Sequence, residues 1–105
     1  MQKVEAFIKS RRLDEIILAL QEIEGLKGMT ITDVRGFGRG RPNGIRSLRN
    51  NTKIEVFCSD EMEEVVVSTI EKAAHTGLRS DGKIYVIPLK EAVRISTRER
   101  GPEAL

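Results

Sequence analysis

Residues 30–39 have the sequence Thr-Ile-Thr-Asp-Val-Arg-Gly-Phe-Gly-Arg, and the interpretation of the chain starts from this stretch. Its first half is rich in threonine and β-branched aliphatic residues, a composition typical of a strand. Gly36 and Gly38 follow, and glycine lets the backbone approach a ligand closely because it has no Cβ. Arg39 then supplies a guanidinium group suited to phosphate or carboxylate. The stretch therefore predicts a strand that ends beside an anionic ligand.

A second glycine-containing stretch, Ser80-Asp81-Gly82-Lys83, precedes the apolar residues 84–87. Backbone N–H groups in such a turn, together with a cation, form the kind of concavity that binds phosphate. Neither stretch has the spacing of a Walker A sequence, and two ordinary glycine turns would have the same composition. We carry forward the hypothesis that the two stretches meet around a phosphate-bearing ligand.

Composition limits the fold and the function. With 105 residues and 39% hydrophobic residues, the chain is expected to form one small domain (1–105) with a thin core. Such a domain often shares core area with copies of itself. Cys58 is the only cysteine and lies in an apolar run, so we expect a buried thiol and a reducing compartment. No signal peptide or membrane span is predicted, which favours a cytoplasmic location.

The positive charge is unevenly distributed, although the net charge of +2 is small. Between Asp33 and Glu55 there is no acidic residue, and six cations fall there: Arg35, Arg39, Arg41, Arg46, Arg49 and Lys53. Residues 39–52 show no periodicity and are predicted to be a loop, and a loop of this length is often functional. It could contact nucleic-acid backbone, but aromatic residues for base stacking are lacking. Docking on an acidic protein is the alternative.

Hydrophobic periodicity predicts the order β-α-β-β-α-β. Strands are expected at residues 3–9, 29–37, 53–58 and 84–87, with helices from residue 13 to Gly25 or Gly28 and from Ser59 to Gly77. This is the α+β, ferredoxin-like arrangement, a four-stranded antiparallel sheet with both helices on one face. Apolar residues on both sides of the strands predict that other subunits cover the second face. Residues 93–96 are expected to add a strand, and 97–105 a mobile tail.

Catalytic chemistry is not indicated. His75 near a helix end has no readable nucleophile partner, and one cysteine with one histidine does not make a metal site. The sequence therefore favours a binding protein over an enzyme.

The order of these features resembles the PII signal-transduction family, known for nitrogen regulation, along most of the chain. The matching segments are residues 4–9, 13–15, 28–39, 53–55, 76–77, 81–86 and 93–95. The resemblance implies a compact homotrimer of ferredoxin-like subunits with an adenine nucleotide (ATP, ADP or AMP) bound in each cleft between neighbours. It implies no prosthetic group.

The resemblance also assigns roles to individual positions. Gly28, Met29 and Thr30 correspond to the segment that holds the adenine, and Glu55 to an acid near the ribose and adenine. The phosphates would meet Gly36, Phe37, Gly38 and Arg39, the second loop Asp81, Gly82 and Lys83, and Arg94 from the neighbouring subunit. The basic loop corresponds to the family's T-loop, in which Arg41, Arg46 and Arg49 would contact a target.

Several departures from the family pattern bear on function. The T-loop is shorter than usual and lacks the tyrosine motif, so uridylylation is not expected. Gly40 and Asn51 replace residues that help to bind magnesium and 2-oxoglutarate, which makes 2-oxoglutarate a less favoured effector and leaves bicarbonate as another. Ser80 replaces a glycine, and Ser96 replaces a phosphate-reaching arginine, so ADP or AMP is expected to bind as well as ATP or better. Arg98 is a candidate substitute.

We therefore predict a divergent PII-like regulator that binds an adenine nucleotide between subunits and controls a target protein through its T-loop. The target could be a membrane transporter or a component of bicarbonate or nitrogen metabolism. The alternatives are a small nucleic-acid-binding module that uses the arginine-rich loop, or a scaffold that binds no nucleotide.

Overall fold

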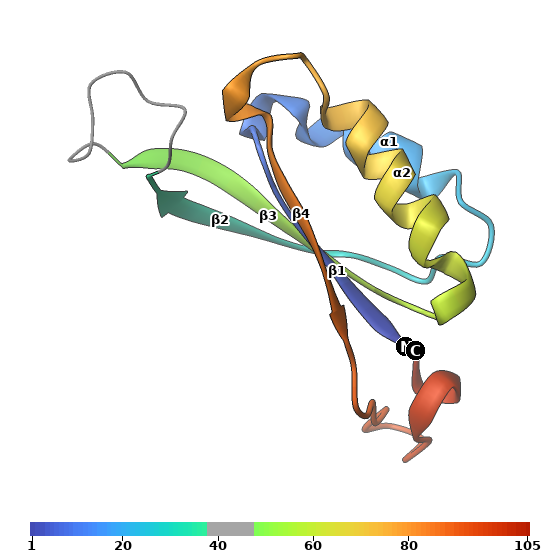
Figure 1. The fold of residues 1–105 in the computed structure, drawn as a ribbon. Coiled ribbons are helices and arrows are strands. Elements are labelled where there is room, and N and C mark those ends of the chain that lie inside the picture. Colours follow the sequence, from blue (N-terminus) through green and yellow to red (C-terminus); the bar gives the residue numbers. More distant parts are fainter. Residues whose placement is uncertain (38–47) are drawn as a thin grey trace.

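The structure, a computed structural model, describes residues 1–37 and 48–105 and has the predicted order of elements (Figure 1). The strands and helices are β1 (Gln2–Ile8), α1 (Leu13–Gln21), β2 (Thr30–Gly36), β3 (Arg49–Cys58), α2 (Glu63–Ala74) and β4 (Gly82–Pro88). Short 3-10 helices occur at Ser10–Arg12, Asp60–Met62, Arg79–Asp81 and Gly101–Ala104.

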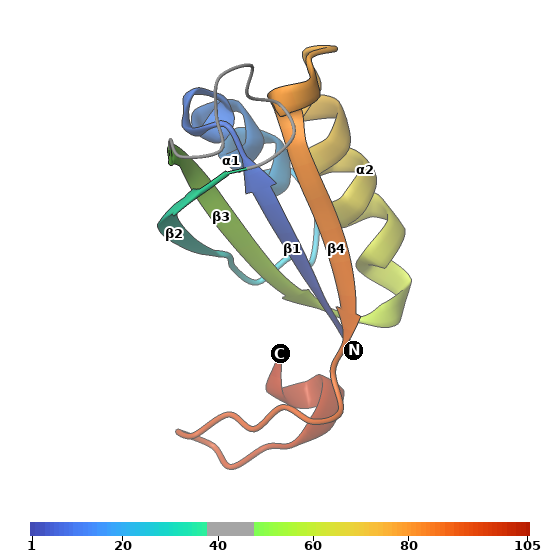
Figure 2. The same cartoon turned by 60° about the vertical axis from the view of Figure 1, so that its left-hand side comes forward.

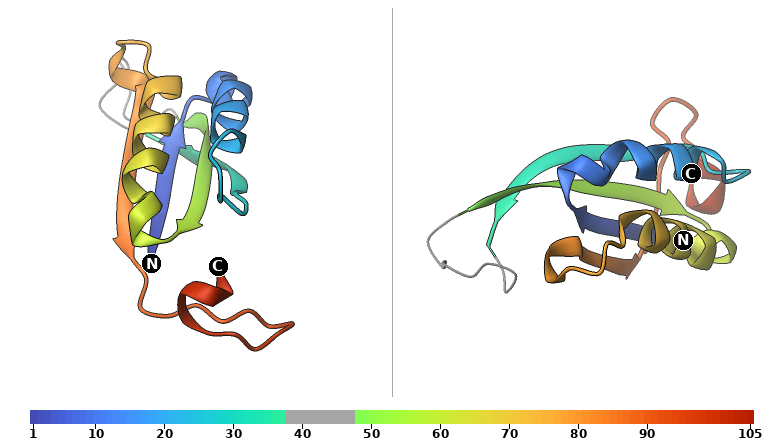
Figure 3. Two further views of the ribbon diagram at one scale, coloured as in Figure 1. Left: turned by 90° about the vertical axis from the view of Figure 1, so that its right-hand side faces the viewer. Right: turned by 90° about the horizontal axis from the view of Figure 1, so that it is seen from above.

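The four strands form one antiparallel sheet in the order β2-β3-β1-β4. Both helices cover the same face of this sheet, as the views along and across the strands show (Figures 2 and 3). β2 and β4 are therefore the two edges, with β3 and β1 between them. The predicted ferredoxin-like arrangement is confirmed.

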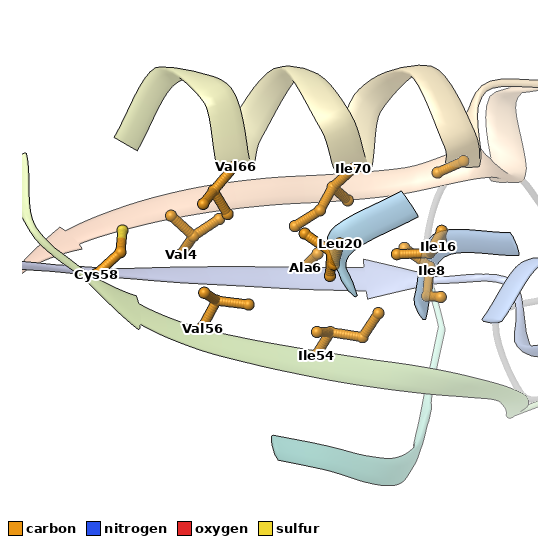
Figure 4. Packing of buried hydrophobic residues seen from close by; sticks show 11 residues of the cluster. Val4, Ala6, Ile8, Ile16, Leu20, Ile54, Val56, Cys58, Val66 and Ile70 are labelled. Atoms are coloured by element: carbon orange, nitrogen blue, oxygen red, sulfur yellow. The ribbon is translucent and has the colours of Figure 1, made fainter. Parts of the chain in front are cut away.

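The core lies between the sheet and the helices and follows directly from alternation in the strands. Every second residue of β1 and β3 faces the helices, and the helices contribute residues at helical spacing (Figure 4). The core comprises Val4, Ala6, Ile8, Ile16, Leu20, Ile54, Val56, Cys58, Val66, Ile70 and Ala74. Full burial of one of the larger aliphatic side chains contributes about 1.5–3 kcal/mol. Cys58 is buried as predicted, and this burial raises the pKa of its thiol.

The second face of the sheet has no helix over it and carries both apolar and charged residues. Phe57, Tyr85 and Ile87 are 43%, 47% and 40% exposed there, and the rings of Phe7 and Tyr85 meet edge to face at 6.1 Å. Such an exposed apolar face is typical of an interface. That other copies of the chain cover it stays a prediction.

The predicted loop was too long at its C-terminal end. β3 begins at Arg49, where the backbone pairs with Gly36, and Asn50 and Asn51 pair with Arg35 and Val34. Sheet pairing thus gives this polar segment a strand structure that its own side chains do not favour. Arg49 consequently belongs to the start of a strand and not to the loop. The helices are also shorter than predicted, α1 ending at Gln21 and α2 at Ala74, and Ser59 makes no side-chain cap.

The predicted strand in the C-terminal segment was wrong, and that residues 97–105 are mobile stays a prediction. Residues 93–96 form no strand, and Val93 makes only an isolated bridge with Arg100. The residues after 97 turn back and are held, because the backbone N–H of Arg94 donates to Glu99 and that of Gly101 donates to Ala92, both at 2.9 Å. This folded tail lies beyond the end of the sheet at which β4 finishes (Figure 2).

No helix in the described part of the chain is long and apolar enough to cross a membrane.

Candidate functional site

The second glycine stretch forms the entrance to β4, and its conformation depends on Gly82. This residue has φ of +112°, in the region that favours glycine. A Cβ placed on it would lie 1.8 Å from the carbonyl oxygen of Phe7, in the neighbouring strand β1. No side chain fits in that space, so the close packing of β1 and β4 itself requires glycine here.

Asp81 is the most highly connected residue of this loop. Its carboxylate accepts hydrogen bonds from the backbone N–H groups of Thr76, at 2.7 Å, and Gly77, at 3.0 Å, and from the Thr76 hydroxyl. Lys9 Nζ lies 3.3 Å from Asp81 Oδ1. The bonds from Thr76 are the main reason that the pKa of the Asp81 carboxyl lies well below its usual range. Asp81 is therefore a carboxylate at any physiological pH.

Lys83 follows Gly82 and pairs with Phe7 across the sheet. It is exposed and forms no ion pair with any other described residue, so its ammonium group can meet a ligand. A cavity of about 360 Å³ adjoins this loop. It is lined by Asp81, Gly82 and Lys83, which belong to the predicted site, and by Glu71 and His75 at the end of α2.

The adenine segment, residues 28–30, and the first phosphate stretch, which starts at Gly36, lie along or beside β2, the edge of the sheet opposite β4. Thr30 opens β2 and pairs with Glu55, and Gly36 closes it. Phe37 is 67% exposed, and a Cβ at Gly28 or Gly36 would meet no atom of residues 1–37 and 48–105 within 4 Å. Met29 differs from this group, because it packs against the core. The two glycines thus leave room beside β2 that the described residues do not fill.

Glu55 lies on the open face of the sheet within a group of charges. Its carboxylate is 3.1 Å from Lys3 Nζ and 3.7 Å from Lys53 Nζ, and Lys3 also contacts Glu5 at 2.8 Å. The hydrogen bond that Lys3 donates is the main cause that lowers the pKa of Glu55, and the hydrogen bonds that Lys3 donates to Glu5 and Glu55 raise its own pKa. The Glu55 side chain is therefore engaged with lysines of its own sheet.

Arg94 belongs to the folded tail, at the other end of β4 from Lys83. Its guanidinium group donates a hydrogen bond of 3.0 Å to the carbonyl oxygen of Leu105. β4 is seven residues long, so about 20 Å of strand separates the tail from the Gly82 loop. Arg98, the suggested substitute for an arginine at position 96, adopts a left-handed conformation with φ of +65° in the turn of this tail.

The predicted site residues therefore fall into three separate groups in one chain. β2 and β4 are opposite edges with two strands between them, roughly 14 Å apart, and the tail lies beyond the far end of β4. Gly38, Arg39, Arg41 and Arg46 lie outside the described residues. Within the part of the chain that the structure describes, a single subunit does not bring the predicted groups together.

Two cations near the second glycine stretch, Lys9 and Arg11, were not among the predicted site residues. Lys9, Arg11 and Arg49 line a cavity of about 390 Å³ with Asn50, Asn51 and Ser80. Lys9 and Arg11 come just after β1. Because β1 pairs antiparallel with β4, the end of β1 lies beside the loop that precedes β4, and this pairing could have predicted their position. Among residues 1–37 and 48–105, no cluster of three or more histidine, cysteine, aspartate or glutamate side chains could hold a metal ion.

Comparison with known proteins was decisive for the family. The family model described as "Nitrogen regulatory protein P-II" matches residues 1–99. Nitrogen regulatory protein P-II of Azospirillum brasilense is 42% identical and that of Bradyrhizobium diazoefficiens 41%, each over 113 alignment positions that cover both chains in full. The protein of the same name from Nostoc punctiforme is 38% identical over the same span. Since this chain has 105 residues, eight alignment positions have no residue of this chain, in keeping with a shortened loop. The chain belongs to the P-II nitrogen regulatory protein family.

Proposed function

We propose that this protein is a cytoplasmic, trimeric sensor that binds an adenine nucleotide between neighbouring subunits and passes the signal to a target protein. Proteins of this family are signal-transduction regulators, not enzymes. The observation that carries the proposal is the separation of the predicted site residues onto opposite edges of one sheet. A site that uses both edges needs a second copy of the chain.

In the proposed site, each subunit offers a different part to each of its two neighbours. The loop with Asp81, Gly82 and Lys83 of one subunit meets the phosphates, and Arg94 reaches them from the neighbour. The stretch Gly36, Phe37, Gly38 and Arg39, the adenine-binding segment Gly28, Met29 and Thr30, and Glu55 of β3 complete the site across the same interface. The exposed Lys83 and the open space beside Gly28 and Gly36 support this assignment.

The nucleotide would act by changing the conformational population of the loop that holds Arg41 and Arg46 and that ends at Arg49. Their positive charge favours an acidic surface on the target, such as a membrane transporter. With fewer cations available for a γ-phosphate, ADP or AMP would bind as well as ATP or better. A small anion, bicarbonate or less favourably 2-oxoglutarate, would be the second effector.

Calorimetric titration with ATP, ADP and AMP, alone and with magnesium plus 2-oxoglutarate or bicarbonate, is the direct test. We expect saturable binding near one nucleotide per chain. If no nucleotide binds, the scaffold replaces this proposal. If only nucleic acid binds, with an affinity that falls steeply with salt, the nucleic-acid module replaces it.

A mixing experiment tests the placement of the site between subunits. Lys83→Ala and Arg94→Ala should each weaken ADP binding, because each removes a charge-assisted hydrogen bond. If the two residues reach one nucleotide from different subunits, trimers refolded from both variants regain one intact site each. A mixture that stays as weak as its parents would place both residues in the same subunit's site and contradict the proposal.

A further inference from the structure

The connection between α2 and β4 is held together by one side chain. Asp81 lies immediately before β4, and it reaches back to Thr76 and Gly77, immediately after the end of α2. The ammonium group of Lys9, just after β1, approaches the same carboxylate and lies 3.5 Å from the Thr76 hydroxyl. The end of β1 and the segment between α2 and β4, which are more than 60 residues apart in the sequence, therefore converge on Asp81.

The carboxylate of Asp81 has no capacity left for a ligand. Two oxygens offer about four acceptor positions. Two backbone N–H groups, the Thr76 hydroxyl and the Lys9 ammonium group supply four donors. His75 lies farther away, with Nδ1 at 3.7 Å, and its side chain is 73% exposed. The residue is a saturated internal acceptor that is only 18% exposed.

Residues 82 and 83 depend on this arrangement. Gly82 packs against the carbonyl group of Phe7 with no space for a Cβ, so the backbone position of Asp81 sets where β4 begins and how Lys83 is presented. We propose that Asp81 is a positioning residue: it holds the Thr76–Gly82 segment so that Gly82 and Lys83 meet a phosphate group, and it makes no contact with the ligand itself. The ligand half of this inference rests on the proposed function.

The direction in which the ADP affinity changes when Asp81 is replaced distinguishes a positioning role from a purely electrostatic one. Removal of a negative charge close to bound phosphates, with release of the Lys9 ammonium group, strengthens binding of an anion if electrostatics alone decides. The substitution Asp81→Asn keeps the size of the side chain but replaces one acceptor oxygen by an N–H donor. That donor would face other donors, namely the Lys9 ammonium group and the backbone N–H groups of Thr76 and Gly77. A positioning role therefore predicts weaker binding, opposite to the electrostatic expectation.

The ligand test is calorimetric titration of wild type and Asp81→Asn with ADP and with adenosine. We expect ADP to bind at least tenfold more weakly to the variant and the phosphate-free adenosine to change by less than twofold. Asp14→Asn, an exposed carboxylate of α1, removes the same charge and should leave both affinities as in wild type. ADP binding to Asp81→Asn that is unchanged or tighter would overturn the inference.

The second test uses the protein without nucleotide. Hydrogen exchange of the Thr76 and Gly77 amides, followed by NMR, should be at least tenfold faster in Asp81→Asn. The exchange rates in Thr76→Val should lie between those of wild type and Asp81→Asn. Thr76→Ser keeps the hydroxyl, so its rates should equal those of wild type. Unchanged exchange in Asp81→Asn would show that the carboxylate does not hold the segment. Failure of wild type to bind any nucleotide would reject the proposed function, while this exchange result would still decide the positioning role.

Discussion

The two glycine stretches that were predicted to approach phosphate differ in what determines their backbone. Around Gly82, the protein itself dictates the conformation: φ is positive, β1 leaves no space for a Cβ, and Asp81 ties the loop to α2. Around Gly36, no described residue has an atom within 4 Å of a Cβ position, and the glycine ends an edge strand. One glycine is needed for folding, and the other leaves space outside the fold.

The comparison shows that two glycines of one predicted site can be present for different physical reasons. A glycine required by internal packing is rigid and can present backbone N–H groups in a fixed direction. A glycine such as Gly36, with no described residue beside its Cβ position, is not required by the internal packing of the described residues. The substitutions below are ordered by the size of the effect that this comparison predicts.

The largest effect is expected from Gly82→Ala. The new Cβ would overlap the Phe7 carbonyl oxygen, and the backbone cannot relieve this without disturbing the pairing of β1 and β4. We expect a loss of at least about 3 kcal/mol in the free energy of unfolding. Urea unfolding at a fixed protein concentration measures it, because an oligomer's stability depends on concentration.

Gly77→Ala is the matched control for Gly82→Ala. Gly77 also has a positive φ, +90°, but a Cβ there meets no atom within 4 Å. Its cost should be that of backbone strain alone, about 1 kcal/mol. Equal losses in the two variants would show that the contact with Phe7 does not matter.

The next effect concerns ligand affinity and compares one cation from each stretch. Lys83→Ala and Arg39→Ala should each lower the affinity for ADP by about 1.5–3 kcal/mol, roughly ten- to a hundredfold, since each removes a charge-assisted hydrogen bond. Calorimetry measures the affinity, and analytical ultracentrifugation should show an unchanged oligomer. An unchanged affinity in both variants would reject the site assignment.

A smaller effect should appear in the pH dependence of stability. The pKa of Asp81 is lower in the folded protein than its ordinary value of 3.8, so its stabilisation is complete above that value and is lost as the pH falls below about 4. The difference in unfolding free energy between wild type and Asp81→Asn should therefore be constant from pH 5 to 7 and shrink below pH 4. If wild type and Asp81→Asn still differed as much in unfolding free energy at pH 3, the stabilisation would not depend on ionisation of Asp81.

The smallest effect on stability is expected from Gly36→Ala. Since no atom of the described residues lies near the new Cβ, the free energy of unfolding should change by no more than about 0.5 kcal/mol. The same variant should nevertheless bind ADP more weakly if a nucleotide from the neighbouring subunit's cleft approaches this backbone. A fully stable variant with unaltered binding would remove Gly36 from the site.

Much of the fold could be predicted because it depends on local patterns. Alternation in residues 3–9 and 53–58 and helical spacing in residues 13–23 correctly predicted the core face of β1, β3 and α1. The start of β3 could not be predicted in this way, since Arg49, Asn50 and Asn51 have low strand propensity and become a strand only by pairing with β2. The folded tail was missed for the same reason, because its backbone hydrogen bonds join residues that show no periodicity.

For the site, the sequence by itself determined the chemistry: two glycine stretches, the cations beside them, and a resemblance that the family comparison then confirmed. Only the tertiary structure decided which glycine is irreplaceable, because the contact of Gly82 with Phe7 exists only once β1 pairs with β4. The tertiary structure alone also shows that Asp81 and Lys9 form an ion pair. It further shows that the two predicted glycine stretches lie at opposite edges of one sheet. Composition and spacing record which groups are available, whereas pairing across the sheet decides which of them meet.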